Sequence, residues 1–215
     1  MTFLESGIPS IYGSPQSGKE IFLGWWYHSE YDTIDKADPE KFEMFLKAYL
    51  SVVLRLSSEP VLPYNFAKTA EVILNELRSL NEKLGGRDNG VLKLEALLKK
   101  AEEFKSKAER LMELSTKLEN PETAKKLNDY LIKLARVTVP INHSTTLYKG
   151  KYDYMGTRYK PVNILQEINE LVEMDPSDGR YHALLTKLLR ARNRVSDALT
   201  SAIEIVDEAL EKLGQ

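Results

Sequence analysis

Apolar residues recur with a helical period from residue 38 to the end of the chain, whereas the preceding residues show no such period. The period predicts helices at residues 39–57, 65–84, 89–118, 121–139, 161–171 and 177–213. Asp38 followed by Pro39 predicts the start of the first helix, because an aspartate caps the first turn and a proline there loses no hydrogen bond. Asn65 can cap the second helix, and Gly85-Gly86 is a natural left-handed stop after it.

The first and third predicted helices differ in how much of their surface is apolar. In the helix at 89–118 the apolar residues form one stripe, with Glu and Lys on the other face. In the helix at 39–57 the polar positions form a single narrow stripe of Glu40, Glu43, Lys47, Ser51 and Arg55. A helix that is apolar over most of its circumference needs neighbours on more than one side.

The last predicted helix is the longest, with enough residues for a rod of ~50 Å at ~1.5 Å per residue. Beside the long third helix, it implies an antiparallel bundle in which short connections place successive helices side by side. We therefore expect a mainly α fold: an antiparallel bundle of four or more helices, two of them long, with a short irregular or β N-terminal segment. The Leu, Ala and Phe stripes most simply form the core of this bundle.

The N-terminal segment has prolines and glycines among isolated aromatic residues. Residues 8–12 and 20–25 are predicted as short strands, joined by a loop at 13–18. A two-stranded ribbon alone is only marginally stable in water. We therefore interpret this segment as the edge of a larger sheet, or as a segment that docks on a partner.

Composition excludes several classes of protein. The chain of 215 residues is 42% hydrophobic and 29% charged, with a net charge of −2, which is typical of one large domain or one domain plus a fragment. Basic and acidic residues are interleaved, which argues against nucleic-acid binding, and no apolar run approaches the ~20 residues of a membrane span. No signal peptide is recognisable. The absence of cysteine fits a reducing compartment or a hot one, and a cytoplasmic location is favoured.

The run from Trp25 to Thr33 is the one place where residue types suited to chemistry lie close together in the sequence. His28 is a candidate metal ligand, because a neutral imidazole is the commonest protein ligand of a catalytic metal. A working zinc site needs about three protein ligands, and the chain has only His28, His143 and His182 and no cysteine. Carboxylates stay possible as further ligands. The alternative is that His28 is a packed or solvated histidine, as we expect for His143 and His182.

Short motifs in the first part of the chain follow the order seen in a known family. They are Gly7-Ile8-Pro9-Ser10, Tyr27-His28-Ser29-x-Tyr31-Asp32-Thr33, Asp38-Pro39 and Val61-Leu62-Pro63-Tyr64-Asn65. In these motifs the chain resembles the C-terminal third of the co-catalytic zinc peptidases that include glutamate carboxypeptidase II, and of their non-catalytic relative, the transferrin receptor. The later half resembles the helical dimerisation domain of that family in the order and length of its helices.

The resemblance implies roles for a few residues. His28 would be the last ligand of a two-zinc site, and the hydroxyl of Tyr27 would hydrogen-bond the tetrahedral intermediate as charge develops on oxygen. A Lys-Tyr or Tyr-x-Gly element of the helical domain would bind the terminal carboxylate of the substrate, which implies Lys151 and Tyr152, or Tyr154. Tyr154 is preferred, because a glycine follows it with the spacing found in the family.

Two departures limit what the resemblance implies. Tyr12 and Ser14 stand where glutamate carboxypeptidase has arginines for an acidic substrate side chain, so a broader amino- or carboxypeptidase specificity stays open. The bridging aspartate, the other zinc ligands and the general-base glutamate of the family all precede the Gly-Ile-Pro-Ser motif, which here follows Met1 closely. The chain alone is therefore expected to hold no zinc and to hydrolyse no peptide.

The resemblance divides the chain into a C-terminal remnant of the zinc peptidase domain at residues 1–62 and a transferrin receptor-like dimerisation domain at residues 63–215. We expect a homodimer whose two-fold interface is formed by the bundle and which completes the substrate pocket of the parent peptidase. Zinc, the peptide substrate and the upstream peptidase domain would be its partners in the full-length protein. The alternatives are a receptor-like or scaffolding relative that has lost the metal site, and a free-standing helical module that binds partners.

Overall fold

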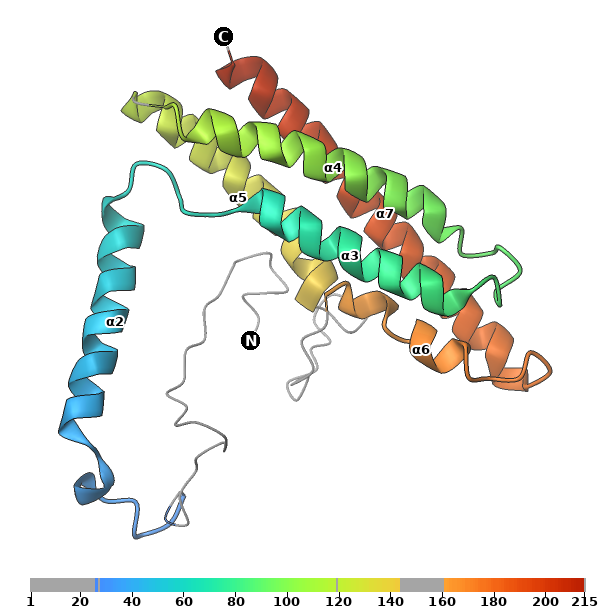
Figure 1. The fold of residues 1–215 in the computed structure, drawn as a ribbon, viewed down its shortest axis with the longest axis horizontal. Helices are drawn as coiled ribbons and strands as arrows, with labels where there is room; N and C mark the ends of the chain where they lie inside the picture. The colour runs from blue at the N-terminus through green and yellow to red at the C-terminus, as the bar shows by residue number, and fades with distance from the viewer. Residues whose placement is uncertain (1–25, 27, 119, 144–160, 215) are drawn as a thin grey trace. The chain divides into compact units, whose positions relative to one another are not determined.

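The computed structural model describes residue 26 and residues 28–118, 120–143 and 161–214. Within this part of the chain the secondary structure is helical, in the order η1 Ile34–Lys36, α2 Pro39–Ser58, α3 Phe66–Leu84, α4 Leu94–Ser115, α5 Pro121–His143, η2 Asn163–Leu165, α6 Ile168–Leu171 and α7 Gly179–Leu213. The mainly α fold expected from the sequence is confirmed (Figure 1). The β segment expected at residues 8–12 and 20–25 lies outside the described residues.

Contacts between residues divide the chain into two units. The described residues from Tyr64 onward form one compact unit, which contains α3 to α7, and those up to Pro63 belong to the other, which contains η1 and α2. The assignment of residues 1–62 to a peptidase remnant and of residues 63–215 to a dimerisation domain stays a prediction.

Four long helices build the bundle of the larger unit. α4 packs against both α3 and α7, and α7 also packs against α5, while η2 and α6 close one end. Figure 1 shows that α3 and α4 run in opposite directions, as do α5 and α7, whereas α4 and α7 run in the same direction. Successive helices are therefore not all neighbours: α5 follows α4 in the chain but makes its main contacts with α7.

The core of the bundle consists of the apolar stripes expected from the sequence. On α4 the buried residues are Leu94, Leu97, Ala101, Phe104, Ala108 and Leu111. Phe104 is fully buried, and the other long helices bury residues that include Leu77, Leu131 and Leu199. The apolar stripes of the long helices therefore form the core of the bundle.

Both predicted helix caps near the N-terminal half are confirmed. The Asp38 carboxylate accepts hydrogen bonds from the backbone N–H groups of Glu40 (3.1 Å) and Lys41 (3.2 Å) at the start of α2. The Asn65 side chain accepts the N–H of Lys68 (2.9 Å) at the start of α3. Gly85 follows α3 with a φ of 52°, the left-handed conformation that glycine adopts without a steric cost.

The predicted start of α4 at residue 89 is wrong, because the chain turns until Leu94. Asp88 is only 3% exposed, and its carboxylate accepts the N–H groups of Gly90 (3.2 Å) and Leu92 (2.6 Å). Asn89, Gly90 and Lys93 all have positive φ. An aspartate that satisfies nearby backbone donors competes with helix formation, so these residues form a loop instead.

The predicted end of α5 before Pro140 is also wrong, because the helix continues to His143. Proline cannot donate the helical hydrogen bond, but tertiary packing outweighs that loss here. Ile141 in the following turn is 2% exposed, and the side chain of Asn142 accepts the backbone N–H of Val162 (3.0 Å).

The segment predicted as one helix at residues 161–171 is divided. Val162 has a φ of 48°, which interrupts the helical path before η2, and α6 begins only at Ile168. The predicted start of the last helix lies close to the observed one: α7 begins at Gly179, with Asp178 as its cap.

Candidate functional site

His28 lies in a turn that ends shortly before η1. The backbone N–H and the hydroxyl of Ser29 both donate to the carbonyl of Trp26, at 3.0 and 2.6 Å. The N–H of Asp32 then donates to the carbonyl of Ser29 at 3.1 Å. These bonds close the turn around His28, which is exposed and has a φ of 62°. A left-handed histidine is uncommon, and such conformations concentrate at functional sites.

Short-range charge pairs order the chain between this turn and α2. Asp35 accepts a hydrogen bond from the Thr33 hydroxyl and forms an ion pair with Lys36. The Lys36 ammonium and then the Thr33 hydroxyl lower the pKa of Asp35 to about 2. The side chain and backbone N–H of Lys41 likewise lower the pKa of Asp38, the cap of α2. Both carboxylates are therefore ionised at neutral pH.

The described residues do not supply a metal site around His28. No group of three or more His, Cys, Asp or Glu side chains in the described ranges is arranged to hold a metal ion. A two-zinc centre would need donors beyond these residues. Of the other predicted site residues, Tyr27, Lys151, Tyr152 and Tyr154 lie outside the described residues, so the structure does not test whether they approach His28.

The other two histidines have simpler settings. His182 is exposed near the start of α7 and contacts the ring of Tyr181 edge-on, with ring centroids 5.5 Å apart. Tyr181 is itself buried, and its hydroxyl donates to the carbonyl of Arg87 at 2.7 Å. This agrees with the structural role expected for His182. The side chain of His143 lies outside the described residues.

The apolar surface of α2 is the most conspicuous surface feature of the described residues. This helix of 20 residues buries none of them. Its exposed large apolar side chains are Phe42, Met44, Leu46, Tyr49, Leu50, Val52, Val53, Leu54 and Leu56. The described residues of its own unit therefore do not supply the neighbours expected on more than one side, and these side chains are exposed.

The bundle has a different kind of surface. Among its described residues the exposed large apolar side chains are Val91 and Ile132. Its outward positions are mostly charged, and they pair across helices, as Arg78 does with Glu102 (2.9 Å) and Lys107 with Asp207 (2.6 Å).

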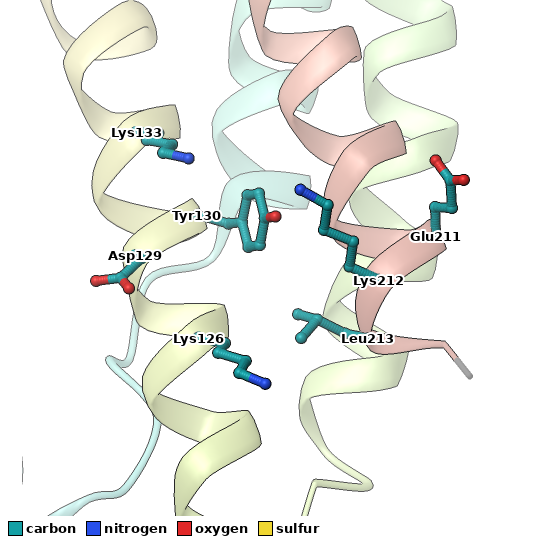
Figure 2. A pocket seen from close by; sticks show the side chains of 7 residues that line it. All are labelled: Lys126, Asp129, Tyr130, Lys133, Glu211, Lys212 and Leu213. Carbon is teal, nitrogen blue, oxygen red and sulfur yellow. The ribbon is translucent and has the colours of Figure 1, made fainter.

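The structure also shows a cavity that the sequence pattern did not reveal. It lies between α5 and the C-terminal end of α7, and Lys126, Tyr130, Lys133 and Lys212 contribute to its walls (Figure 2). The spacing of Lys126, Tyr130 and Lys133 places all three on one face of α5, which was readable from the sequence. Lys212 could not be added without knowing that α5 packs against α7.

No family model, curated protein or solved structure matches the chain. None of the described helices is both long and apolar enough to cross a membrane. The resemblance to zinc peptidases therefore depends on the sequence motifs alone.

Proposed function

We propose that this chain is the association region of a glutamate carboxypeptidase-like zinc peptidase, in which α2 docks on the upstream peptidase domain and the bundle is the dimerisation domain. The observation that carries the proposal is the apolar face of α2. A helix that exposes nine large apolar side chains is stable in water only when another surface covers it.

The sequence of α2 defines which side the partner covers. Glu43, Lys47, Ser51 and Arg55 form the polar stripe, in which Lys47 and Glu43 are paired at 2.6 Å. The apolar residues occupy the rest of the circumference, so the partner must be broad and itself apolar. Removing side chains of this size from water contributes on the order of 1 kcal/mol each when they start half-exposed. The sum over the face is enough to hold two domains together.

In the parent protein, His28 would supply one zinc ligand next to this docked helix. The turn that holds His28 in a left-handed conformation and the capped start of α2 follow each other in the chain, so docking of α2 would also fix the histidine. Tyr27 would lie beside the reacting carbonyl, and Tyr154, or Lys151 with Tyr152, would bind the terminal carboxylate of a peptide.

The homodimer is the second part of the proposal. Because the amphipathic stripes of the bundle are buried in its own core, a two-fold interface on the described bundle would be polar. Polar interfaces are typical of partners that also exist apart. The homodimer is therefore proposed to be reversible rather than obligate.

Thiol labelling tests the docking of α2, because the chain has no cysteine of its own. In the full-length protein, a Val53→Cys variant should react slowly with a maleimide, since Val53 lies on the apolar face. A Ser51→Cys variant on the polar stripe is the matched control and should react at the rate of an exposed thiol. Equal reactivity of the two positions would contradict docking through the apolar face.

The peptidase assignment is tested separately. In the full-length protein, His28→Ala should abolish chelator-sensitive peptide hydrolysis while leaving the labelling pattern of α2 unchanged. Hydrolysis that is unaffected by this substitution would remove the zinc-ligand role. A protein without any metal-dependent hydrolysis, but with a protected α2, would instead be the receptor-like or scaffolding relative.

A further inference from the structure

A cavity of about 500 Å³ opens between the first half of α5 and the last turn of α7. Lys126, Tyr130 and Lys133 line it from α5, and Lys212 and Leu213 line it from α7. Tyr130 is only 7% exposed and forms the floor between the two helices. The cavity is far along the chain from His28 and belongs entirely to the bundle.

The basic and acidic side chains around this cavity point in different directions. Figure 2 shows the ammonium groups of Lys126, Lys133 and Lys212 turned toward the space around the Tyr130 ring, whereas the carboxylate of Asp129 points away from it. The carboxylate of Glu211, on the other helix, also points away. The residues that line the cavity carry both signs of charge, but the ammonium groups face into it and the carboxylates of Asp129 and Glu211 do not.

One carboxylate, Glu208 on α7, lies close enough to Lys212 and to Lys133 for both to lower its pKa, so the three lysines have one described counter-charge between them. Lys212 forms an ion pair with Glu208, which raises the pKa of Lys212 and lowers that of Glu208. Lys133 lies over the Tyr130 ring, with its Nζ 4.8 Å from the centroid, and neither Lys133 nor Lys126 forms a salt bridge in the described ranges. Ammonium groups that share a cavity repel each other unless an anion joins them.

We propose that this cavity binds a multivalent oxyanion, a phosphate ester or a polycarboxylate, through Lys126, Lys133 and Lys212. Lysine presents a compact charge with three rotatable donors, so the ammonium groups can adapt to either kind of oxygen cluster. The ligand would join α5 to the end of α7 by bridging their lysines. This site is independent of the zinc peptidase proposal, because it uses no residue of that site.

Nuclear magnetic resonance titration of the full 215-residue chain tests the site with inorganic pyrophosphate and, separately, citrate. Ionic strength is held constant with sodium chloride. We expect saturable amide shifts confined to residues 126–133 and 208–213. A lower Kd for pyrophosphate would identify phosphate chemistry, and a lower Kd for citrate would identify polycarboxylate chemistry.

The double variant Lys126→Gln/Lys133→Gln should weaken binding by about tenfold or more, because each partly exposed charge pair contributes a factor of up to about five. The control, Lys99→Gln/Arg190→Gln, removes the same charge from exposed positions elsewhere in the bundle and should leave the Kd unchanged. Both pairs of side chains are exposed, so neither variant should unfold the chain. Unchanged binding in the first variant, or identical shifts with sodium chloride alone, would overturn the site.

Discussion

At the scale of single residues, side chains of the same type differ widely in how much of their surface is buried. Phe104 on α4 is fully buried, whereas Phe42 on α2 is 67% exposed. Both are apolar positions of helices that the sequence predicts. Phe104 is therefore expected to contribute much more than Phe42 to the stability of the isolated chain.

Phe104→Ala should lower the free energy of unfolding of the chain by about 3–5 kcal/mol, because it leaves a cavity in a packed core. Phe42→Ala should change it by no more than about 0.5 kcal/mol, as for an exposed position. Urea denaturation followed by circular dichroism measures both. A large loss for Phe42→Ala would show that α2 is already covered in the isolated chain.

Asp178 gives a prediction about pH. Its carboxylate pairs with the guanidinium of Arg180 (2.8 Å) and caps α7 by accepting the backbone N–H of Arg180 (2.8 Å), and these two contacts, in that order, lower the pKa of Asp178 to about 2. A lowered pKa means that the ionised form stabilises the fold. This stabilisation is fully present above the ordinary value of 3.8 and disappears as the pH falls through about 2.

Asp178→Ala should therefore lower the Tm at pH 7 and have a much smaller effect near pH 2, where about half of the carboxyl groups are protonated. Asp178→Asn is the matched control, because it keeps a capping oxygen and loses only the charge. Its Tm at pH 7 should lie between those of the wild type and Asp178→Ala. If the difference in Tm between the wild type and Asp178→Ala were the same at every pH, the ionised carboxylate would not be the stabilising group.

At the scale of elements, a helix boundary could be predicted where the signal for it is local, and it was missed where tertiary contacts decide it. The caps at Asp38 and Asn65 act within one turn, so their sequence signature is sufficient. The end of α5 depends instead on Ile141 and Asn142, whose partners come from other parts of the bundle. The proline at position 140 was therefore a misleading stop signal.

Asn142→Ala should lower the free energy of unfolding by about 1–3 kcal/mol, because the N–H of the fully buried Val162 would lose its acceptor. Hydrogen exchange should show faster exchange at the Val162 amide in the variant. Asn193→Ala, at an exposed position of α7, serves as a control and should leave this amide unchanged. Unaltered exchange at Val162 would show that water replaces the lost acceptor.

At the scale of the whole molecule, the two units differ in the side chains that they expose. The unit from Tyr64 onward buries its apolar residues and exposes charged ones, whereas α2 of the other unit buries none of its residues and exposes large apolar side chains. The bundle therefore has an apolar core of its own, and the exposed apolar side chains of α2 are the surface that the proposed docking would cover.

Light scattering coupled to size exclusion should report a mass that approaches twice 24.5 kDa at tens of micromolar and falls on dilution, because a polar interface gives a reversible dimer. Phe42→Gln/Val53→Gln should leave this dimer intact if the bundle forms it. Lys47→Gln/Ser51→Gln, on the polar stripe of α2, is the matched control. A strictly monomeric chain at these concentrations would remove the proposed dimer.

The sequence by itself determined the helical class, most of the helix positions and the residues of the bundle core, because periodicity and caps are local properties of the chain. It also singled out α2 as apolar on most sides. Only the tertiary structure decided that α2 buries none of its residues, that α5 pairs with α7, and that three lysines from two helices line one cavity. These features depend on which elements pack against each other, and the local sequence around each residue does not determine that packing.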